Sequence, residues 1–165
     1  MNFANCPFAR TPPKSSGMKE TADIEAMYID TSVAVKLYFT ESDSDSCEMT
    51  ARGTTLVSSR LLYCEFRSAL FGKISRGKLP AESGTRVWQA FELDVSSDKI
   101  RLVSLSDLLV QDAADLLRDL HPHVPLRTLD ALHLVTFLSV DSGPLFTKDL
   151  RMRQAATHLG LPLAD

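Results

Sequence analysis

The chain has 165 residues, which suits one domain large enough to bury a core, and its 44% hydrophobic and 24% charged residues are usual for globular proteins. This composition excludes the fibrous, disordered and disulfide-scaffold classes. The net charge of −3 is not the basic signature of many nucleic-acid binders, although cations bound to clustered carboxylates would offset it.

The first 26 residues differ from the rest of the chain. They show no apolar periodicity, and the segment Arg10–Gly17 is polar and rich in turn-forming residues. We interpret residues 1–26 as a flexible leader, with at most a short helical turn at 20–26. This leader is either native or an extension that is not part of the native domain. We expect the domain proper to cover residues 27–165.

From Met27 onward, short apolar runs alternate with helical patterns, which predicts an α/β fold with a mainly parallel sheet. Strands are predicted at 27–29, 54–58, 100–103 and 144–147, with an edge strand at 161–163. Helices are predicted from near Ser32, over 60–76, through 87–91, from Ser106 through 120, over 129–140 and over 150–159. Residues 41–45 are expected to form a loop or a helix start. Ser59, Ser106 and Thr128 are predicted to cap helices, and Gly160 to follow a helix end.

Four carboxylates lie where a parallel sheet places its chemistry. Asp30 directly follows the first strand, and Asp149 follows the fourth strand at the start of the last helix. Because ligand crevices form outside the carboxyl ends of parallel strands, we expect these two acids to converge. Asp130 lies in the first turn of its helix, and Glu65 lies further along its own.

Three of these acids also have a structural interpretation. Asp130 can complement the positive end of its helix, and Asp149 can be an ordinary N-cap. Glu65 can be the exposed member of an amphipathic helix, with Arg60 and Arg67 nearby. Asp30 has less structural use at the end of an apolar strand.

Carboxylates that lie close together raise one another's pKa, and hard divalent cations such as Mg²⁺ or Mn²⁺ remove that penalty. Such cations activate a bound water for attack on phosphorus and stabilise the leaving oxygen. An all-carboxylate set therefore favours phosphodiester hydrolysis over zinc chemistry. His133, three residues after Asp130, can be a ligand too, but a packed, hydrogen-bonded histidine is favoured between Leu132 and Leu134.

Four segments, in order, resemble the motifs of PIN-domain nucleases, particularly the toxins of VapBC toxin–antitoxin pairs. The segments are 28–38, 62–70, 126–135 and 145–156 with 158–160, so they extend across 27–163. The third segment is the most specific match. The resemblance implies a PIN-like three-layer α/β/α domain, an endoribonuclease activity that uses Mg²⁺ or Mn²⁺, an RNA substrate, a cognate antitoxin and a homodimer.

The resemblance also assigns residues. The family's catalytic, metal-binding quartet is matched by Asp30, Glu65, Asp130 and Asp149, with Asp30 and Asp130 as the firmest ligands. Supporting hydroxyls are expected from Thr31, Ser32 and Thr147. Candidate contacts to RNA phosphates are Arg60, Arg67, Lys73 and Arg76, on or beside the helix of Glu65.

Two other functions are alternatives to this one. A catalytically silent PIN-fold module would bind RNA or a protein without cleaving, and it would have no need of all four acids. A small-molecule phosphohydrolase acting through Asp30 is disfavoured, because the chain has no second acid two residues on and no Gly-rich phosphate loop.

The cysteines and the apolar runs bear on location. Cys6, Cys47 and Cys64 have no C-x-x-C spacing, which is typical of reducing compartments and argues against a zinc ribbon or a secreted scaffold. No apolar run reaches the length of a membrane span, and no signal-peptide core is present. We therefore expect a cytoplasmic protein without a membrane partner.

Overall fold

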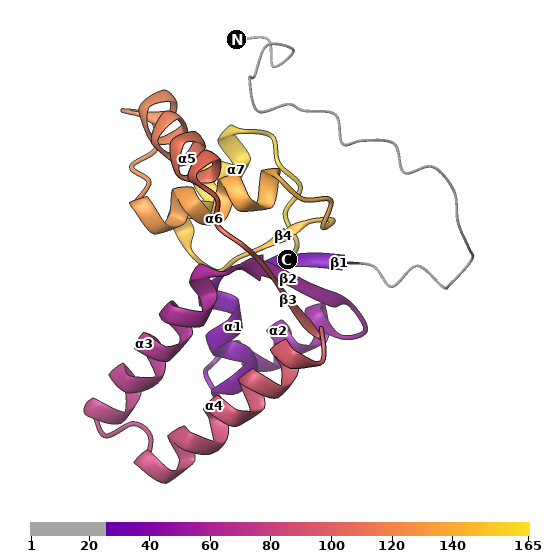
Figure 1. Cartoon of the computed structure of the whole chain (residues 1–165), viewed down its shortest axis with the longest axis vertical. Coiled ribbons are helices and arrows are strands. Elements are labelled where there is room, and N and C mark those ends of the chain that lie inside the picture. The colour runs from indigo at the N-terminus through magenta and orange to yellow at the C-terminus, as the bar shows by residue number, and fades with distance from the viewer. Residues whose placement is uncertain (1–25) are drawn as a thin grey trace, which may run out of the picture.

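The structure is a computed structural model that describes residues 26–165, and a four-stranded parallel sheet lies at its centre (Figure 1). The strands are β1 (Ala26–Ile29), β2 (Thr55–Ser59), β3 (Ile100–Val103) and β4 (Leu145–Phe146), in the order β3-β2-β1-β4. The helices are α1 (Thr31–Tyr38), α2 (Ser44–Ala51), α3 (Leu61–Ser75), α4 (Ala81–Ser96), α5 (Asp107–Leu120), α6 (Thr128–Leu138) and α7 (Leu150–His158). The expected leader lies outside the described residues except for Ala26, which begins β1.

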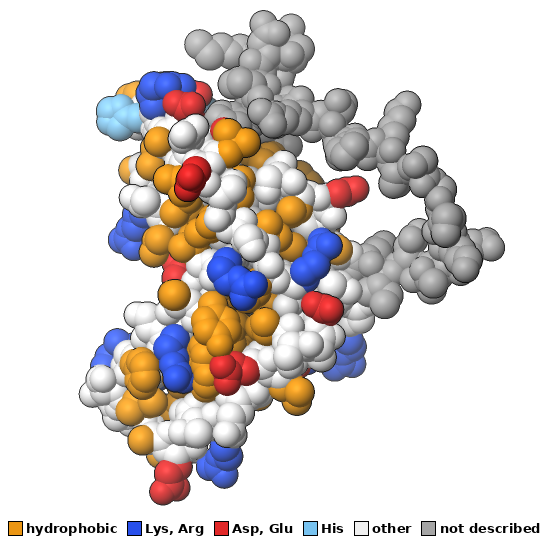
Figure 2. Space-filling view, in the orientation of Figure 1, with side chains coloured by type: hydrophobic (Ala, Val, Ile, Leu, Met, Phe, Trp, Pro, Cys, Tyr) orange, Lys and Arg blue, Asp and Glu red, His pale blue; other side chains and the backbone are white. Residues whose placement is uncertain are grey.

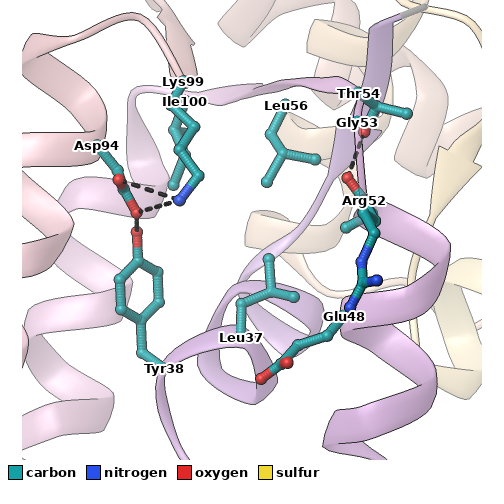
Figure 3. Close-up of a pocket in the computed structure, with 11 residues that line it drawn as sticks. Leu37, Tyr38, Glu48, Arg52, Gly53, Thr54, Leu56, Asp94, Lys99 and Ile100 are labelled. Carbon is teal, nitrogen blue, oxygen red and sulfur yellow. Dashed lines mark hydrogen bonds and ion pairs between the residues drawn. The ribbon is translucent and has the colours of Figure 1, made fainter.

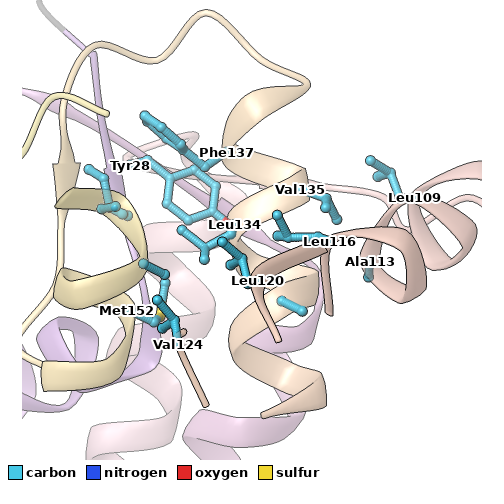
Figure 4. Packing of buried hydrophobic residues seen from close by; sticks show 14 of the residues in the cluster. Tyr28, Leu109, Ala113, Leu116, Leu120, Val124, Leu134, Val135, Phe137 and Met152 are labelled. Atoms are coloured by element: carbon cyan, nitrogen blue, oxygen red, sulfur yellow. The ribbon is translucent and has the colours of Figure 1, made fainter. Parts of the chain in front are cut away.

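Helices cover both faces of the sheet, so the predicted three-layer α/β/α fold is confirmed (Figure 1). Alternate residues of β1 point to opposite faces, as a strand requires. Tyr28 belongs to the hydrophobic cluster formed with α5, α6 and α7, and its ring lies edge-on to that of Phe137 (Figure 4). Its neighbours Met27 and Ile29 pack instead with the helices α1 to α4. Two hydrophobic clusters therefore hold the sheet, one on each face.

The strand order places β1 between β2 and β4, and this position determines where the site forms. β1 pairs with β4 in the register Tyr28↔Leu145 and Ile29↔Phe146. The next residues along these strands are Asp30 and Thr147, so their side chains leave neighbouring strand ends together. The carboxyl ends of adjacent parallel strands that send the chain to opposite faces form the usual ligand crevice of such sheets.

Gly143 permits the close approach of β4 to β1. Its backbone has φ +66°, a conformation that L side chains rarely adopt, and a Cβ atom there would collide with the carbonyl oxygen of Ala26. Only glycine therefore fits at the turn that brings Leu145 beside Tyr28.

Most element bounds agree with the sequence expectations, and the differences have physical causes. The predicted strand at 144–147 shortens to β4, because Pro144 has no N–H and the Thr147 hydroxyl is engaged with carboxylate and backbone groups of the site. The edge strand at 161–163 reduces to a single bridge, Leu145↔Leu163. The segment 41–45 leads into α2, which the sequence left undecided.

Of the three predicted N-caps, one is confirmed. Ser106 accepts the N–H of Leu109 at the start of α5. Ser59 ends β2 and only assists α3, because its hydroxyl accepts the N–H of Leu61 at 3.4 Å. The prediction for Thr128 is wrong, since Thr128 is the first residue of α6 and the cap position belongs to Arg127. Gly160 follows the end of α7 with φ +66°, as predicted.

Candidate active site

Asp30 lies at the carboxyl end of β1 and is 3% exposed. Its Oδ1 accepts hydrogen bonds from the Ser32 hydroxyl at 2.7 Å and the Val33 N–H at 3.2 Å, and its Oδ2 accepts one from the Thr147 hydroxyl at 2.7 Å. The bond from Val33 makes Asp30 the N-cap of α1. The expectation that Asp30 has less structural use than the other acids is therefore wrong, because it caps a helix as Asp149 does.

Asp149 and Asp130 also close the N-termini of helices. Asp149 Oδ1 accepts the N–H groups of Arg151 at 2.8 Å and Met152 at 3.2 Å, so its interpretation as the N-cap of α7 is confirmed. Asp130 Oδ2 reaches back to the N–H of Arg127 at 3.1 Å, in front of α6. Three of the four acids thus lie at the positive ends of helix dipoles, where a negative charge is favoured.

Glu65, on α3, is held by two donors at one oxygen. Its Oε2 accepts from the Thr31 hydroxyl at 2.5 Å and lies 2.8 Å from His133 Nε2. Burial acts to raise the pKa of Glu65, but the hydrogen bonds from His133 and Thr31 lower it below its ordinary value. With a side chain that is 21% exposed and doubly bonded, Glu65 is not the solvated residue of the structural interpretation.

In two of the other acids, Asp30 and Asp130, the pKa shifts in the opposite direction, upward. Burial raises the pKa of Asp30 despite the hydroxyl groups of Ser32 and Thr147. Burial also raises the pKa of Asp130, and the charge of Asp149 adds to that effect. Charged carboxylates are therefore costly here, and a nearby cation would favour their ionised forms.

Hydroxyl groups contact two of the acids, Asp30 and Glu65, and one of them joins Asp30 to Asp149. Thr147 donates to Asp30 and accepts the N–H of Asp149 at 3.1 Å. Ser32 donates to Asp30 and accepts the N–H of Lys148 at 2.9 Å, while Thr31 donates to Glu65. All three expected hydroxyls therefore contact acids of the quartet.

The donor set suits a hydrated cation and not a closed cage. Within residues 26–165, no three His, Cys, Asp or Glu side chains gather closely enough to enclose a metal ion. Mg²⁺ keeps several of its waters and commonly binds through one or two carboxylates, so it does not require such a cage. The oxygen-only donors and the raised pKa values of Asp30 and Asp130 fit a cation of this kind.

The sequence did not predict that Tyr28 would be hydrogen-bonded beside the acids. For His133 it left two interpretations open, a metal ligand or a packed residue. His133 is buried and hydrogen-bonded to Tyr28 and Glu65, as the packed interpretation expected. The signal for Tyr28 was its position two residues before Asp30, but a tyrosine in an apolar strand is read first as core.

The candidate RNA contacts differ in how free they are. Lys73 bonds to Glu41 at 2.6 Å, and Arg67 lies 4.0 Å from the centre of the Trp88 ring. The Arg76 guanidinium packs against Gly72, and Arg60 is exposed at the start of α3. Figure 2 shows basic side chains scattered among acidic and apolar ones on the face in view, without a continuous basic surface there.

A separate hollow of about 370 Å³ lies at the other end of the strands (Figure 3). Its lining includes Gly53 and Thr54 before β2 and Lys99 before β3, so it faces away from the acids. Within it, Tyr38 and Lys99 both bond to Asp94. The quartet therefore does not line this hollow.

Replacing Thr147 with valine tests how strongly the acids depend on their hydroxyl partners. Thr147→Val keeps the side-chain shape but leaves an oxygen of Asp30 and the N–H of Asp149 without their partner. We expect the free energy of unfolding of the metal-free protein to fall by about 1–3 kcal/mol, as measured by urea titration. Thr147→Ser should lose less, and the exposed control Thr157→Val should stay close to the parent. Equal losses for Thr147→Val and the control would contradict this account.

Comparisons with known proteins agree with the sequence resemblance. The family model for the PIN domain matches residues 27–157. Ribonuclease VapC46 of Mycobacterium tuberculosis is 38% identical to this chain over 139 residues, which cover 82% of this chain and 94% of that protein.

Proposed function

The chain belongs to the PIN-domain family and is of the VapC ribonuclease type, and we propose from this premise that it is a metal-dependent endoribonuclease, the toxin of a type II toxin–antitoxin pair. The observation that carries the proposal is the pair of acids Asp30 and Asp149, which Thr147 joins at the carboxyl ends of β1 and β4. A catalytically silent module is not favoured, because its function would not need these acids.

The proposed mechanism divides the acids by role. Asp30 and Asp130 would hold Mg²⁺ or Mn²⁺, which when bound lowers the pKa of a water and offsets charge on the phosphate. Glu65 and Asp149 would complete the shell or orient the attacking water. Thr31, Ser32 and Thr147 hold the carboxylates in place, so that little rearrangement is needed before reaction.

RNA binding is proposed along α3. Arg60 and Arg76 are the freest of the candidate cations, whereas Lys73 is paired with Glu41 and Arg67 with Trp88. Each phosphate contact releases counterions, so cleavage under subsaturating RNA should fall as salt rises. Arg60→Gln should reduce that salt dependence.

The partners follow from the toxin assignment. We propose that the protein binds a cognate antitoxin and forms a homodimer. Such an assembly would cover the apolar side chains exposed on α5, Leu108 and Val110. Light scattering of the purified chain measures whether it is a dimer.

Among the described residues no helix is both long and apolar enough to cross a membrane. The cytoplasmic location stays a prediction.

Removing the metal tests the catalytic proposal. The purified, antitoxin-free protein is incubated with tRNA or rRNA in Mg²⁺, in Mn²⁺ and in EDTA, and the fragments are resolved on gels. We expect cleavage in either metal and none in EDTA, with activity returning when the metal is restored in excess. Cleavage that persists in EDTA would contradict metal dependence, and intact RNA in every condition would contradict the nuclease assignment for these substrates.

A further inference from the structure

Two buried side chains without a part in the proposed chemistry, Tyr28 and His133, are hydrogen-bonded in series to Glu65. Tyr28 Oη lies 3.0 Å from His133 Nδ1, and His133 Nε2 lies 2.8 Å from Glu65 Oε2. Tyr28 is fully buried and His133 is 2% exposed. These residues come from β1, α6 and α3, so the series joins three elements of the fold at one acid of the quartet.

The direction of each hydrogen bond in the series depends on the tautomer of His133 and on the partners of Tyr28. Its oxygen accepts the backbone N–H of Ser59 at 3.1 Å, and that group can only donate. The same hydroxyl lies 3.0 Å from His133 Nδ1 and is also near the hydroxyl of Thr136, which donates to the Leu132 carbonyl. In the tautomer of His133 that leaves Nδ1 unprotonated, Nδ1 accepts the hydrogen bond of the phenolic O–H. His133 then carries its own proton on Nε2 and donates it to Glu65.

This arrangement fixes one side of the Glu65 carboxylate. Oε2 accepts from both Thr31 and His133, whereas Oε1 accepts no hydrogen bond from the described residues. The carboxylate cannot rotate without breaking two bonds, one of them to a buried imidazole. Oε1 is thus the oxygen left for another ligand.

We propose that Tyr28 and His133 are positioning residues that orient Glu65, holding Oε2 so that Oε1 is presented to the bound cation or to its water. The proposal rests on the proposed function, because it assigns Glu65 a part in that metal site. His133 also lies three residues after Asp130 on α6, so one helix supplies a proposed ligand and the support for another. Groups that hold metal ligands in this way typically change metal affinity or activity 10–100-fold when removed.

The first test reads the tautomer of His133 and does not depend on catalysis. Long-range ¹H–¹⁵N NMR of the metal-free protein at neutral pH should show His133 with a proton on Nε2 and none on Nδ1. A proton on Nδ1 would contradict the assigned direction of the hydrogen bonds from Tyr28 through His133 to Glu65. In Tyr28→Phe, which removes only the phenolic oxygen, the Nδ1 signal should shift because its donor is gone.

The second test measures Mn²⁺ affinity by calorimetry together with kcat and KM for RNA cleavage. His133→Leu should weaken Mn²⁺ binding and lower kcat, each about 10–100-fold, with little change in KM. His133→Gln, whose amide can still donate to Glu65, should recover part of both losses. Tyr28→Phe should show a smaller loss. The matched control is Tyr38→Phe, because Tyr38 donates to Asp94 on the other side of the domain and should keep both quantities near the parent.

Coupling between the positions separates positioning from a general loss of structure. In a Glu65→Gln background, His133→Leu should cause little further loss of Mn²⁺ affinity, since the carboxylate it orients is gone. Additive losses would overturn the proposal. If His133→Leu does not fold, judged by thermal melting, Tyr28→Phe carries the test, and parent-like behaviour of that variant would overturn it.

The two proposals fail in different ways. A parent protein that neither binds Mn²⁺ nor cleaves RNA contradicts the proposed function. In that case the tautomer of His133 still tests the direction of the hydrogen bonds from Tyr28 to Glu65. An active parent with unchanged His133→Leu and Tyr28→Phe variants contradicts the positioning role alone.

Discussion

Asp30→Asn is expected to lower the rate of RNA cleavage by about 10³-fold, which corresponds to about 4 kcal/mol of lost transition-state stabilisation. Asparagine can still accept from Ser32 and Val33, so the cap of α1 largely survives. Its amide, however, carries no charge for a cation, and it meets a Thr147 hydroxyl that donates to Asp30 in the parent. Single-turnover cleavage with saturating metal and RNA measures the loss.

The control for this variant is Asp115→Asn. Asp115 is an exposed acid on α5 that pairs with Arg118 at the surface. Its replacement therefore removes the same charge from a residue outside the quartet. Cleavage by this control should stay within about twofold of the parent, a change of less than 0.5 kcal/mol. Thermal melting of the metal-free proteins should show Asp30→Asn folded, because burial makes the parent's charge costly at this position. Parent-like cleavage by Asp30→Asn would contradict its place in the site.

Phe66→Ala is expected to lower the free energy of unfolding by about 3–5 kcal/mol, a large part of the 5–15 kcal/mol that usually stabilises a domain. Phe66 is fully buried on α3, and its ring stacks on Phe91 with centres 4.4 Å apart. The rings of Tyr38 and Phe39 lie at 5.1 and 5.9 Å. Truncation would leave a cavity between α1, α3 and α4 that these rigid rings cannot fill. Urea unfolding followed by circular dichroism measures the change.

The matched control is Phe71→Ala on the same helix. Phe71 is 54% exposed, so its truncation should cost much less than that of Phe66. Arg67 lies over its ring at 5.2 Å, and the loss of that contact accounts for the small change expected. Similar losses for the two variants would contradict the packing described on this face of the sheet.

Local patterns were enough to predict the α/β layering and the positions of the acids. The strand at 100–103 has the predicted bounds, and Asp149 caps α7 as its position after a short strand suggested. Each of these features depends on neighbouring residues in the chain. The order and spacing of the motifs supplied the family.

The sequence could not reveal how the acids are held, because that depends on contacts between distant segments. Glu65 and His133 are 68 residues apart, and Asp30 and Thr147 are 117 apart. An isolated Glu65 on α3 resembles a solvated helix residue until α6 is packed beside it. The sequence likewise makes Lys73 a candidate contact to RNA phosphates, and only the fold places Glu41 beside it.

The position of β4 in the sheet also has a consequence during protein synthesis. Of the four described strands, β4 comes latest in the chain, yet it pairs with β1, and Thr147 and Asp149 follow it. A domain generally folds as a unit. A nascent chain that stops before β4 therefore leaves Asp30 without its Thr147 partner. Asp30 and Asp149 are joined through Thr147 only after β4 has been made and has paired with β1.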